Sequence, residues 1–309
     1  MKWTTTSPNH RFECDAFRPA LGAPICLAWL HWPRTARPSR CSNTPSIRTP
    51  ITPDTRDLHE HPNFPCPHRA RNRRTRRHRP RGGGPPARQR PPLAAVGRNA
   101  ETLTDVPADA HVAADTTTPE GAAAAVAACR DQLGGPPTLL AHCVGSTLIA
   151  PLHRSTVAQM REVLRVNLDS ALFMLQAWVE GLRASGQPGA AVLASSVVAR
   201  IGVANHEAIA AAKGGIEALA RSAAATYAPL GLRINAVAPG MTETPMTAGM
   251  LRAEAMREGA GKQYPLGGVQ TAAQVADTMA WLLSDGAARI TGQVIAVDGG
   301  FTTVRPLVK

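Results

Sequence analysis

Small and polar residues follow the apolar runs in the second part of the chain at regular intervals. Gly97, Asp115, Gly145, Ser196 and Pro239 each stand just beyond such a run. In sheets of parallel strands, ligands bind beyond the carboxyl ends of the strands. The spacing therefore predicts that these residues meet at one ligand site.

Two further residues, His206 and Lys213, could carry protons at that site. They are seven residues apart in a predicted helix, which is two turns, so they can share a face. An imidazole titrates near neutrality and could protonate an alkoxide. The competing interpretation is that His206 simply stands at the start of its helix.

Alternating strands and helices from Leu93 onward must position these residues. Apolar runs of strand length alternate with segments of helical periodicity, which predicts an α/β fold with a parallel sheet covered on both faces. The predicted strands are Leu93–Val96, His111–Ala114, Thr138–Cys143, Ala190–Ala194, Arg233–Val237 and Val294–Val297, and the predicted helices are Pro119–Leu133, Val157–Ala184, Glu207–Tyr227 and Ala272–Leu283.

The first 92 residues differ in composition from the rest. They hold 18 Lys and Arg against 5 Asp and Glu, whereas residues 93–309 hold 16 against 17, so the net charge of +12 comes from the leader. Sixteen of the 27 prolines also lie there, and prolines interrupt helices and strands. We expect a disordered Arg- and Pro-rich leader over residues 1–92 and one domain over residues 93–309.

The leader raises three other possibilities, none with a specific signal. Its arginines could neutralise nucleic-acid phosphates, but no aromatic residue stands among those of Arg69–Arg90. Its four cysteines lack the spacing of a zinc site, so no metal is expected. No run approaches a membrane span, and the segment Ala20–Leu30 makes a poor signal peptide. Cys129 and Cys143 suit a reducing compartment, so we expect a cytoplasmic protein.

Five segments of the chain, in order, resemble the short-chain dehydrogenases/reductases. They are VNLDS with Asn167, the ASS strand end with Ser196, AAAKGG with Lys213, RINAVAPGMTET (Arg233–Thr244) and ITGQVIAVDGG (Ile290–Gly300). The likeness runs from Leu93 to the C-terminus. It implies a Rossmann-like doubly wound parallel sheet in three layers, and hydride transfer between a nicotinamide cofactor and a ketone or alcohol.

The resemblance also implies roles for single residues. Ser196, Lys213 and Asn167 match the catalytic serine, lysine and asparagine, and Lys213 would also hold the nicotinamide ribose. On the cofactor side the matching residues are Arg98, Asp115, Gly145, Pro239, Gly240 and Thr244. An arginine at position 98 suits the 2′-phosphate of NADP, although NAD stays possible. Cys143 stands where the family has an asparagine, and Met241–Gly261 resembles the substrate loop.

Two positions depart from the family pattern. The family begins with a strand and a TGxxxGxG loop, but residues 70–92 are rich in arginine and proline, and Pro85 and Pro86 lack the amide donors that such a loop needs. One hypothesis is that the leader is translated from another reading frame, which the coding DNA would reveal. The second departure is Ile209, thirteen residues after Ser196 and four before Lys213, where the family has its catalytic tyrosine.

Two functions of different classes follow from these observations. The first is an NADP-preferring oxidoreductase for a small carbonyl or alcohol substrate, with reduced activity unless another acid such as His206 replaces the tyrosine. The second is a non-catalytic nucleotide-binding or scaffold protein. By resemblance we also expect a homo-oligomer, a dimer or tetramer assembled through Val157–Ala184, Glu207–Tyr227 and Val294–Val297.

Overall fold

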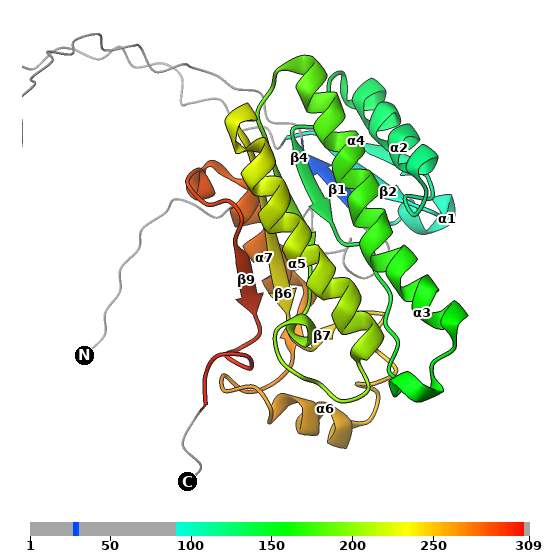
Figure 1. Cartoon of the computed structure of the whole chain (residues 1–309), viewed down its shortest axis with the longest axis vertical. Coiled ribbons are helices and arrows are strands. Elements are labelled where there is room, and N and C mark those ends of the chain that lie inside the picture. Colours follow the sequence, from blue (N-terminus) through cyan, green and yellow to red (C-terminus); the bar gives the residue numbers. More distant parts are fainter. Residues whose placement is uncertain (1–26, 31–90, 306–309) are drawn as a thin grey trace, which may run out of the picture. The chain divides into compact units, whose positions relative to one another are not determined.

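A seven-stranded sheet forms the centre of the part of the chain that the structure, a computed structural model, describes: residues 27–30 and 91–305. The strand order is β3-β2-β1-β4-β5-β6-β9 (Figure 1). The strands are β1 (Leu27–Leu30), β2 (Leu93–Gly97), β3 (Ala110–Ala113), β4 (Leu139–His142), β5 (Gly189–Ala194), β6 (Leu232–Pro239) and β9 (Val294–Val297), and a separate pair joins β7 (Thr242–Glu243) to β8 (Gln270–Thr271).

Every strand pair that excludes β1 is parallel, which confirms the predicted sheet. Gly97 is in register with Ala113, and Ala194 with Val237, so neighbouring strands end at the same edge. The strands are nearly continuous apolar segments because helices cover both faces of the sheet. Their common carboxyl edge carries the residues that the sequence places after each strand.

The strand β1 corrects the expectation that the leader contains no regular structure. Leu27–Leu30 lies between β2 and β4 and pairs with both in the antiparallel direction, with Leu27 beside Val96 and His142 (Figure 1). Leader residues now complete both ladders, which otherwise would expose unpaired edges. The rest of the proposed leader, residues 1–26 and 31–90, lies outside the described residues.

The helices form one layer on each face of the sheet. On one face α2, α4 and α5 pack together over the strands (Figure 1), and on the other lie α7 and the short α1. The described helices are α1 (Ala100–Leu103), α2 (Pro119–Leu133), α3 (Val157–Leu164), α4 (Ser170–Ser185), α5 (Glu207–Tyr227), α6 (Glu254–Gly261) and α7 (Ala272–Leu283), with 3-10 turns at Leu152–Arg154, Val197–Ala199, Ala228–Leu230 and Asp285–Ala287.

The predicted long helix over residues 157–184 is interrupted. Its first part, α3, passes into a π-helical turn at Arg165–Asp169 before α4 begins. Such turns are rare and occur often at functional sites. At its other end α4 stops at Gly186, whose φ of 65° is a left-handed conformation that glycine adopts without strain.

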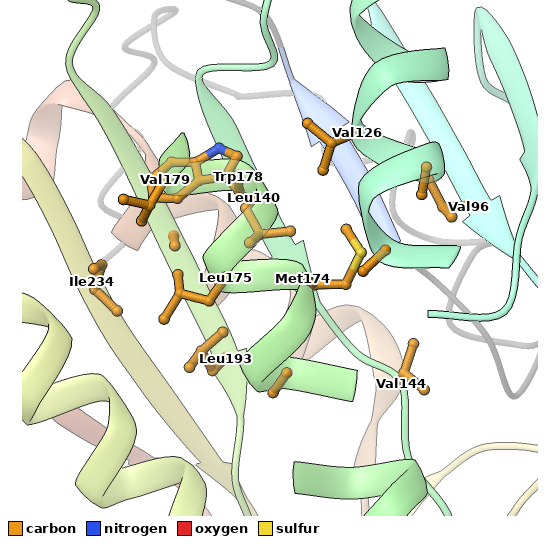
Figure 2. Close-up of a cluster of buried hydrophobic side chains, with 14 of the residues drawn as sticks. Val96, Val126, Leu140, Val144, Met174, Leu175, Trp178, Val179, Leu193 and Ile234 are labelled. Carbon is orange, nitrogen blue, oxygen red and sulfur yellow. The ribbon is translucent and has the colours of Figure 1, made fainter. Parts of the chain in front are cut away.

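The main core lies between the sheet and α4. Trp178, Leu175 and Met174 project from α4 toward Leu140 and Leu193 of the sheet, and all five are at least 97% buried (Figure 2). The Trp178 indole N–H donates to the Pro137 carbonyl at 2.9 Å, so its polar atom is satisfied. This packing fixes the helix that follows the π-helical turn, and therefore the turn itself.

Candidate active site

The β5 strand delivers Ser196 to the carboxyl edge of the sheet. β5 ends at Ala194, and Ser196 then starts a 3-10 turn, where its hydroxyl oxygen accepts a long hydrogen bond of 3.4 Å from the Val198 N–H. Its neighbour Ser195 points inward and donates toward Glu217. Ser196 is half-buried at the carboxyl end of β5.

Lys213 lies on α5 with its side chain buried against this strand end. Its Nζ donates to the Ala194 carbonyl oxygen at 2.8 Å, and the residue is 8% exposed. Burial disfavours the ammonium form and lowers the pKa of Lys213 to about 8. Lys213 and Ser196 therefore meet at the same strand end, that of β5.

Asn167 occupies the π-helical turn and is fully buried. Its Oδ1 accepts from the Ser146 N–H at 3.2 Å, and its Nδ2 donates to the Val163 carbonyl and the Ser146 hydroxyl, at 2.9 and 3.1 Å. The extra residue of the turn aims this side chain at the segment after β4. Asn167 thereby fixes the Gly145–Ser146 segment.

Gly145 stands where these groups converge. A Cβ on this residue would lie 2.9 Å from Asn167 Oδ1 and 3.4 Å from Lys213 Nζ. The absence of a side chain keeps the space beside both groups open. The structure thus brings Gly145, Asn167 and Lys213 together.

The position matched to the family tyrosine is apolar and tightly packed. Ile209 is 4% exposed and forms a cluster with Val163 and Ala212, against which Leu148 and Val198 also pack. Ile209 lies one helical turn before Lys213 on α5. No proton-bearing group replaces the phenol at this place.

His206 stands at the residue before α5. One ring nitrogen, Nδ1, is 2.7 Å from the Ala204 carbonyl oxygen, so it donates there. Along the helix axis His206 is about 10 Å from Lys213, seven residues at 1.5 Å each. This position fits the interpretation that His206 begins the helix.

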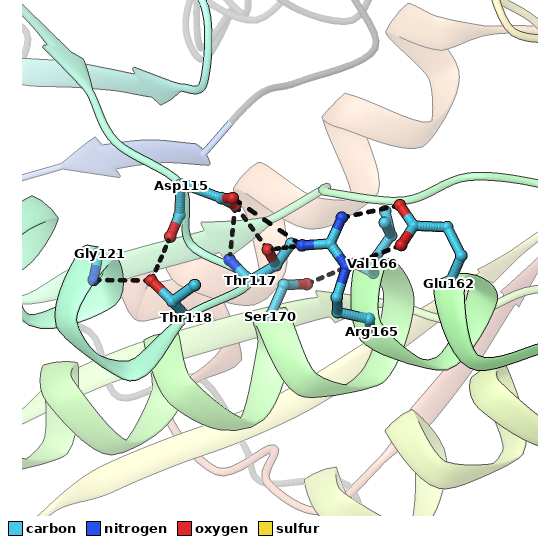
Figure 3. A network of polar contacts seen from close by, with 8 residues as sticks. All are labelled: Asp115, Thr117, Thr118, Gly121, Glu162, Arg165, Val166 and Ser170. Carbon is cyan, nitrogen blue, oxygen red and sulfur yellow. Dashed lines mark hydrogen bonds and ion pairs between the residues drawn. The ribbon is translucent and has the colours of Figure 1, made fainter. Parts of the chain in front are cut away.

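The loop after β3 forms a polar network with the π-helical turn (Figure 3). Asp115 Oδ1 accepts from the Thr117 hydroxyl at 2.6 Å and the Thr117 N–H at 3.0 Å. These bonds, above all that from the Thr117 hydroxyl, lower the pKa of Asp115, and Arg165 and Arg98 lower it further. Arg165 bonds Thr117, lies 3.8 Å from Asp115 Oδ2 and is held by Glu162. Arg98 is exposed at the end of β2, beside this network.

The remaining predicted residues lie at the end of β6. Pro239 ends the strand, and the Gly240 N–H donates to the Val297 carbonyl at 2.9 Å. A Cβ on Gly240 would lie 2.7 Å from the Tyr264 ring, whose hydroxyl accepts from the Met241 N–H. The Thr244 hydroxyl is 3.1 Å from that of Thr247. These residues therefore border the site without contacting Lys213 or Ser196 among the described contacts.

The segment matched to the substrate loop, residues 241–261, contains β7 and α6. An ion pair between Glu243 and Arg257 joins the two elements. An open cavity of about 620 Å³ lies beside them, lined from α6 by Glu254 and Glu258 and from the segment after it by Lys262 and residues 264–269. The lining of this cavity does not include Ser196, Lys213 or Asn167.

Sequence reasoning missed two residues that organise the site, Ser146 and Arg165. Ser146 directly follows Gly145, and small residues after a predicted strand were the signal used for its neighbours. Arg165 looked like an ordinary helix arginine, because the π-helical turn that directs it toward Thr117 leaves no mark in the apolar periodicity.

Cys143, at the position of the family asparagine, packs its sulfur 3.9 Å from that of Met279, and burial raises the pKa of its thiol to about 12.

The described residues contain neither a metal-binding cluster nor a helix that could span a membrane. Within residues 27–30 and 91–305, no group of three or more His, Cys, Asp and Glu side chains is arranged to hold a metal ion. In the same part of the chain no helix is long and apolar enough to cross a membrane.

Comparison with known proteins identifies the family. The profile of the enoyl-(acyl carrier protein) reductases matches residues 93–302. The cis-4-hydroxycyclohexanecarboxylate dehydrogenase of Sinomonas cyclohexanicum is 37% identical over 193 residues, which are 62% of this chain and 76% of that protein.

Two further relatives extend the comparison. The inactive 2-(S)-hydroxypropyl-CoM dehydrogenase 2 of Xanthobacter autotrophicus is 34% identical over 197 residues, 62% of this chain and 85% of that protein. A crystal structure of a gluconate 5-dehydrogenase from Burkholderia cenocepacia with NADP and tartrate is 25% identical, with a TM-score of 0.62 over 68% of this chain and 84% of that one. The chain therefore belongs to the short-chain dehydrogenase/reductase family.

Proposed function

We propose that this protein is a nicotinamide-dependent oxidoreductase that interconverts an alcohol and a ketone. The observation that carries the proposal is the meeting of Ser196 and Lys213 at the end of β5, with Asn167 and Gly145 beside them. The Ser196 hydroxyl would hydrogen-bond the substrate oxygen, and Lys213 and Asn167 would hold the ligand and its water. The related dehydrogenases act on alcohols, which supports the same reaction class.

The residues around Gly145 fit the nicotinamide riboside end of a cofactor. The open space beside Gly145 is bordered by the Nζ donor of Lys213 and the Oδ1 acceptor of Asn167, which suit the hydroxyls of a ribose. When bound, the nicotinamide supplies hydride chemistry. The cofactor's phosphates have less support from the described residues, because β1 runs antiparallel to its neighbours and its carboxyl end lies at the edge opposite the ligand site. We therefore expect weak cofactor affinity.

The apolar surroundings of Ser196 favour an alicyclic substrate. Ile209, Val198 and Leu148 present hydrocarbon where a polar substrate would lose its hydration. The relative from Sinomonas acts on a hydroxylated cyclohexane ring. We propose a ring alcohol or its ketone as the substrate class, in a cytoplasmic homo-oligomer whose contacts involve α4, α5 and β9.

Turnover of cyclohexanol and cis-4-hydroxycyclohexanecarboxylate with NADP tests the function. We expect measurable turnover by the full chain. Ser196→Ala removes one hydrogen bond to the substrate oxygen and should lower kcat/KM about tenfold, the effect of roughly 1.4 kcal/mol. Ser185→Ala, on the surface at the end of α4, is the matched control and should leave turnover unchanged. Equal kcat/KM values for Ser196→Ala and Ser185→Ala would contradict the assigned role.

Arg98 is proposed to select NADP over NAD. It follows β2 at the strand end adjacent to Asp115, where the 2′-phosphate of an adenosine ribose would lie. Arg98→Ala should weaken NADPH binding about tenfold, the value of one charge-assisted hydrogen bond, and leave NADH binding unchanged. Fluorescence titration measures both, with Arg130→Ala on the exposed face of α2 as control. Equal losses of affinity for NADPH and NADH in Arg98→Ala would argue against a contact between Arg98 and the 2′-phosphate.

A non-catalytic nucleotide-binding protein is the second candidate. The apolar packing of Ile209 at the tyrosine position favours it, and the existence of a relative named an inactive dehydrogenase supports it. NADPH binding without turnover of either ring alcohol would favour this candidate over the enzyme.

A further inference from the structure

The first step concerns the proton that a carbonyl reduction requires. When a ketone becomes an alcohol, the carbon takes a hydride and the oxygen takes a proton. The family position for that proton is Ile209, which is 4% exposed and packed against Val163 and Ala212. A different atom must supply the proton if the chain is an enzyme.

Lys213 has the required location. Its Nζ donates to the carbonyl oxygen of Ala194, which stands two residues before Ser196. The amine therefore lies at the strand end that carries the serine hydroxyl. The open side of Gly145 lies 3.4 Å from Nζ, measured to the Cβ that glycine lacks. Among the described contacts, Ala194 accepts one of the three ammonium protons, which leaves two to face this space.

The groups around Lys213 do not neutralise its charge. From β4 the nearest titratable side chains are His142 and Cys143, whose pKa values burial moves so that both are neutral at pH 7. Glu217, further along α5, is turned toward Ser195 and pairs with Arg200 and Arg221. No described carboxylate forms an ion pair with Lys213. A buried ammonium without a counter-ion releases its proton readily.

His206, the other candidate, is separated from this location. It lies before α5, about 10 Å along the helix axis from Lys213, and its Nδ1 donates to Ala204. Cys143 holds its proton too tightly to act near neutral pH. Lys213 is therefore the titratable group that the described structure places at the end of β5, beside Gly145.

We propose that Lys213 Nζ is itself the proton donor in ketone reduction and the proton acceptor in alcohol oxidation by this chain. The inference rests on the proposed function. In reduction, the carbonyl carbon takes a hydride from a reduced nicotinamide. The oxygen takes a proton from the Lys213 ammonium, directly or through one water. The resulting neutral amine regains a proton from solvent.

The decisive variant is Lys213→Arg. Arginine keeps the charge and can still donate to Ala194, but it does not give up its proton. We expect cyclohexanone reduction with NADPH to fall at least about 10²-fold, the usual size of general acid catalysis, with NADPH affinity within about threefold of the parent. In the parent, the reduction rate should fall as pH rises through 8, as the ammonium form is lost.

A second measurement does not depend on activity. Acylation of each lysine by acetic anhydride, followed by mass spectrometry across pH 6–11, reports the free amine of Lys213, with the exposed Lys262 as internal reference. We expect half-maximal labelling of Lys213 near pH 8. A midpoint above pH 10 overturns the proton role whatever the turnover.

The remaining outcomes separate the two proposals. A Lys213→Arg protein that reduces cyclohexanone within about threefold of the parent overturns the proton role alone. Loss of reduction in His206→Ala, with Lys213→Arg still active, assigns the proton to His206 instead. A parent that turns over neither ring alcohol nor ketone while Lys213 titrates near pH 8 contradicts the proposed function.

Discussion

Ile209→Tyr should raise ketone reduction by the full chain above the rate that Lys213 supports, by up to about 10²-fold, the span between the lower and upper ends of what general acid catalysis contributes. The new phenol would lie one turn before Lys213 on α5 and on the same face, next to Val198 of the Ser196 turn. The Lys213 ammonium would lower the pKa of the new phenol toward neutrality, because a nearby positive charge favours phenolate. Proton transfer would then pass from the buried amine to a better placed hydroxyl.

The matched control is Ile209→Phe, which adds the ring without the hydroxyl. Both variants force a larger side chain against Val163, at a cost of about 1–3 kcal/mol in stability, so urea unfolding should show a similar loss for both. Steady-state reduction of cyclohexanone with NADPH then isolates the hydroxyl. Equal reduction rates for Ile209→Tyr and Ile209→Phe would mean that a hydroxyl at position 209 does not donate the proton to the substrate.

The elements predicted best from the sequence are those whose ends carry a chemical signal. Helix α2 starts at Pro119 after Thr118, whose side chain caps the helix by accepting from the Gly121 N–H, and it ends before Gly134 in a left-handed conformation. Helix α7 begins with Thr271 and Gln274 in a capping box. Both sets of bounds were predicted correctly because local residues determine where these helices begin and end.

Two features depend on contacts that sequence periodicity does not encode. The π-helical turn at Arg165–Asp169 adds one residue within a helix whose apolar pattern remains continuous. Strand β1 consists of only four apolar residues in a proline-rich region, and it is specified by the open ladder edges of β2 and β4 on either side. Neither feature could be predicted from local propensity.

The sequence predicted where the residues of the candidate site stand along the strands and helices, but not the hydrogen bonds that join them. Strand ends placed Gly145 and Ser196 correctly, and helix periodicity placed Lys213 one turn after Ile209. The hydrogen bond from Lys213 to Ala194, and those from Asn167 to Ser146, depend on tertiary packing between α5, the π-helical turn and β5. The hydrogen bond of the His206 ring to the Ala204 carbonyl likewise became clear only from the backbone around it.

A buried histidine beneath the site has a consequence for stability in acid. His142 on β4 is 1% exposed, and the Ser170 hydroxyl already donates to the Val166 carbonyl at 2.6 Å. The His142 Nε2–H therefore donates to Ser170 at 3.2 Å, which leaves Nδ1 as an acceptor with no partner among the described residues. Burial, with a smaller effect of Lys213, lowers the pKa of His142 to about 3. The fold therefore requires the neutral ring.

Stability should accordingly fall as pH drops from 7 to 5. Below its ordinary pKa of about 6.5, the histidine of the unfolded chain binds a proton that the folded chain refuses until about pH 3. The free energy of unfolding should decrease by up to about 1.4 kcal/mol per pH unit, or roughly 2 kcal/mol by pH 5. Carboxylates such as Asp115, whose pKa is also lowered, add to the loss only at lower pH, and Lys213 contributes only above pH 8.

Urea unfolding at half-unit pH steps measures how steeply the free energy of unfolding falls with pH. His142→Leu removes the titrating ring and should flatten the curve, whereas the exposed His153→Gln should retain it; a His142→Leu protein with the parent's slope would place the acid sensitivity elsewhere.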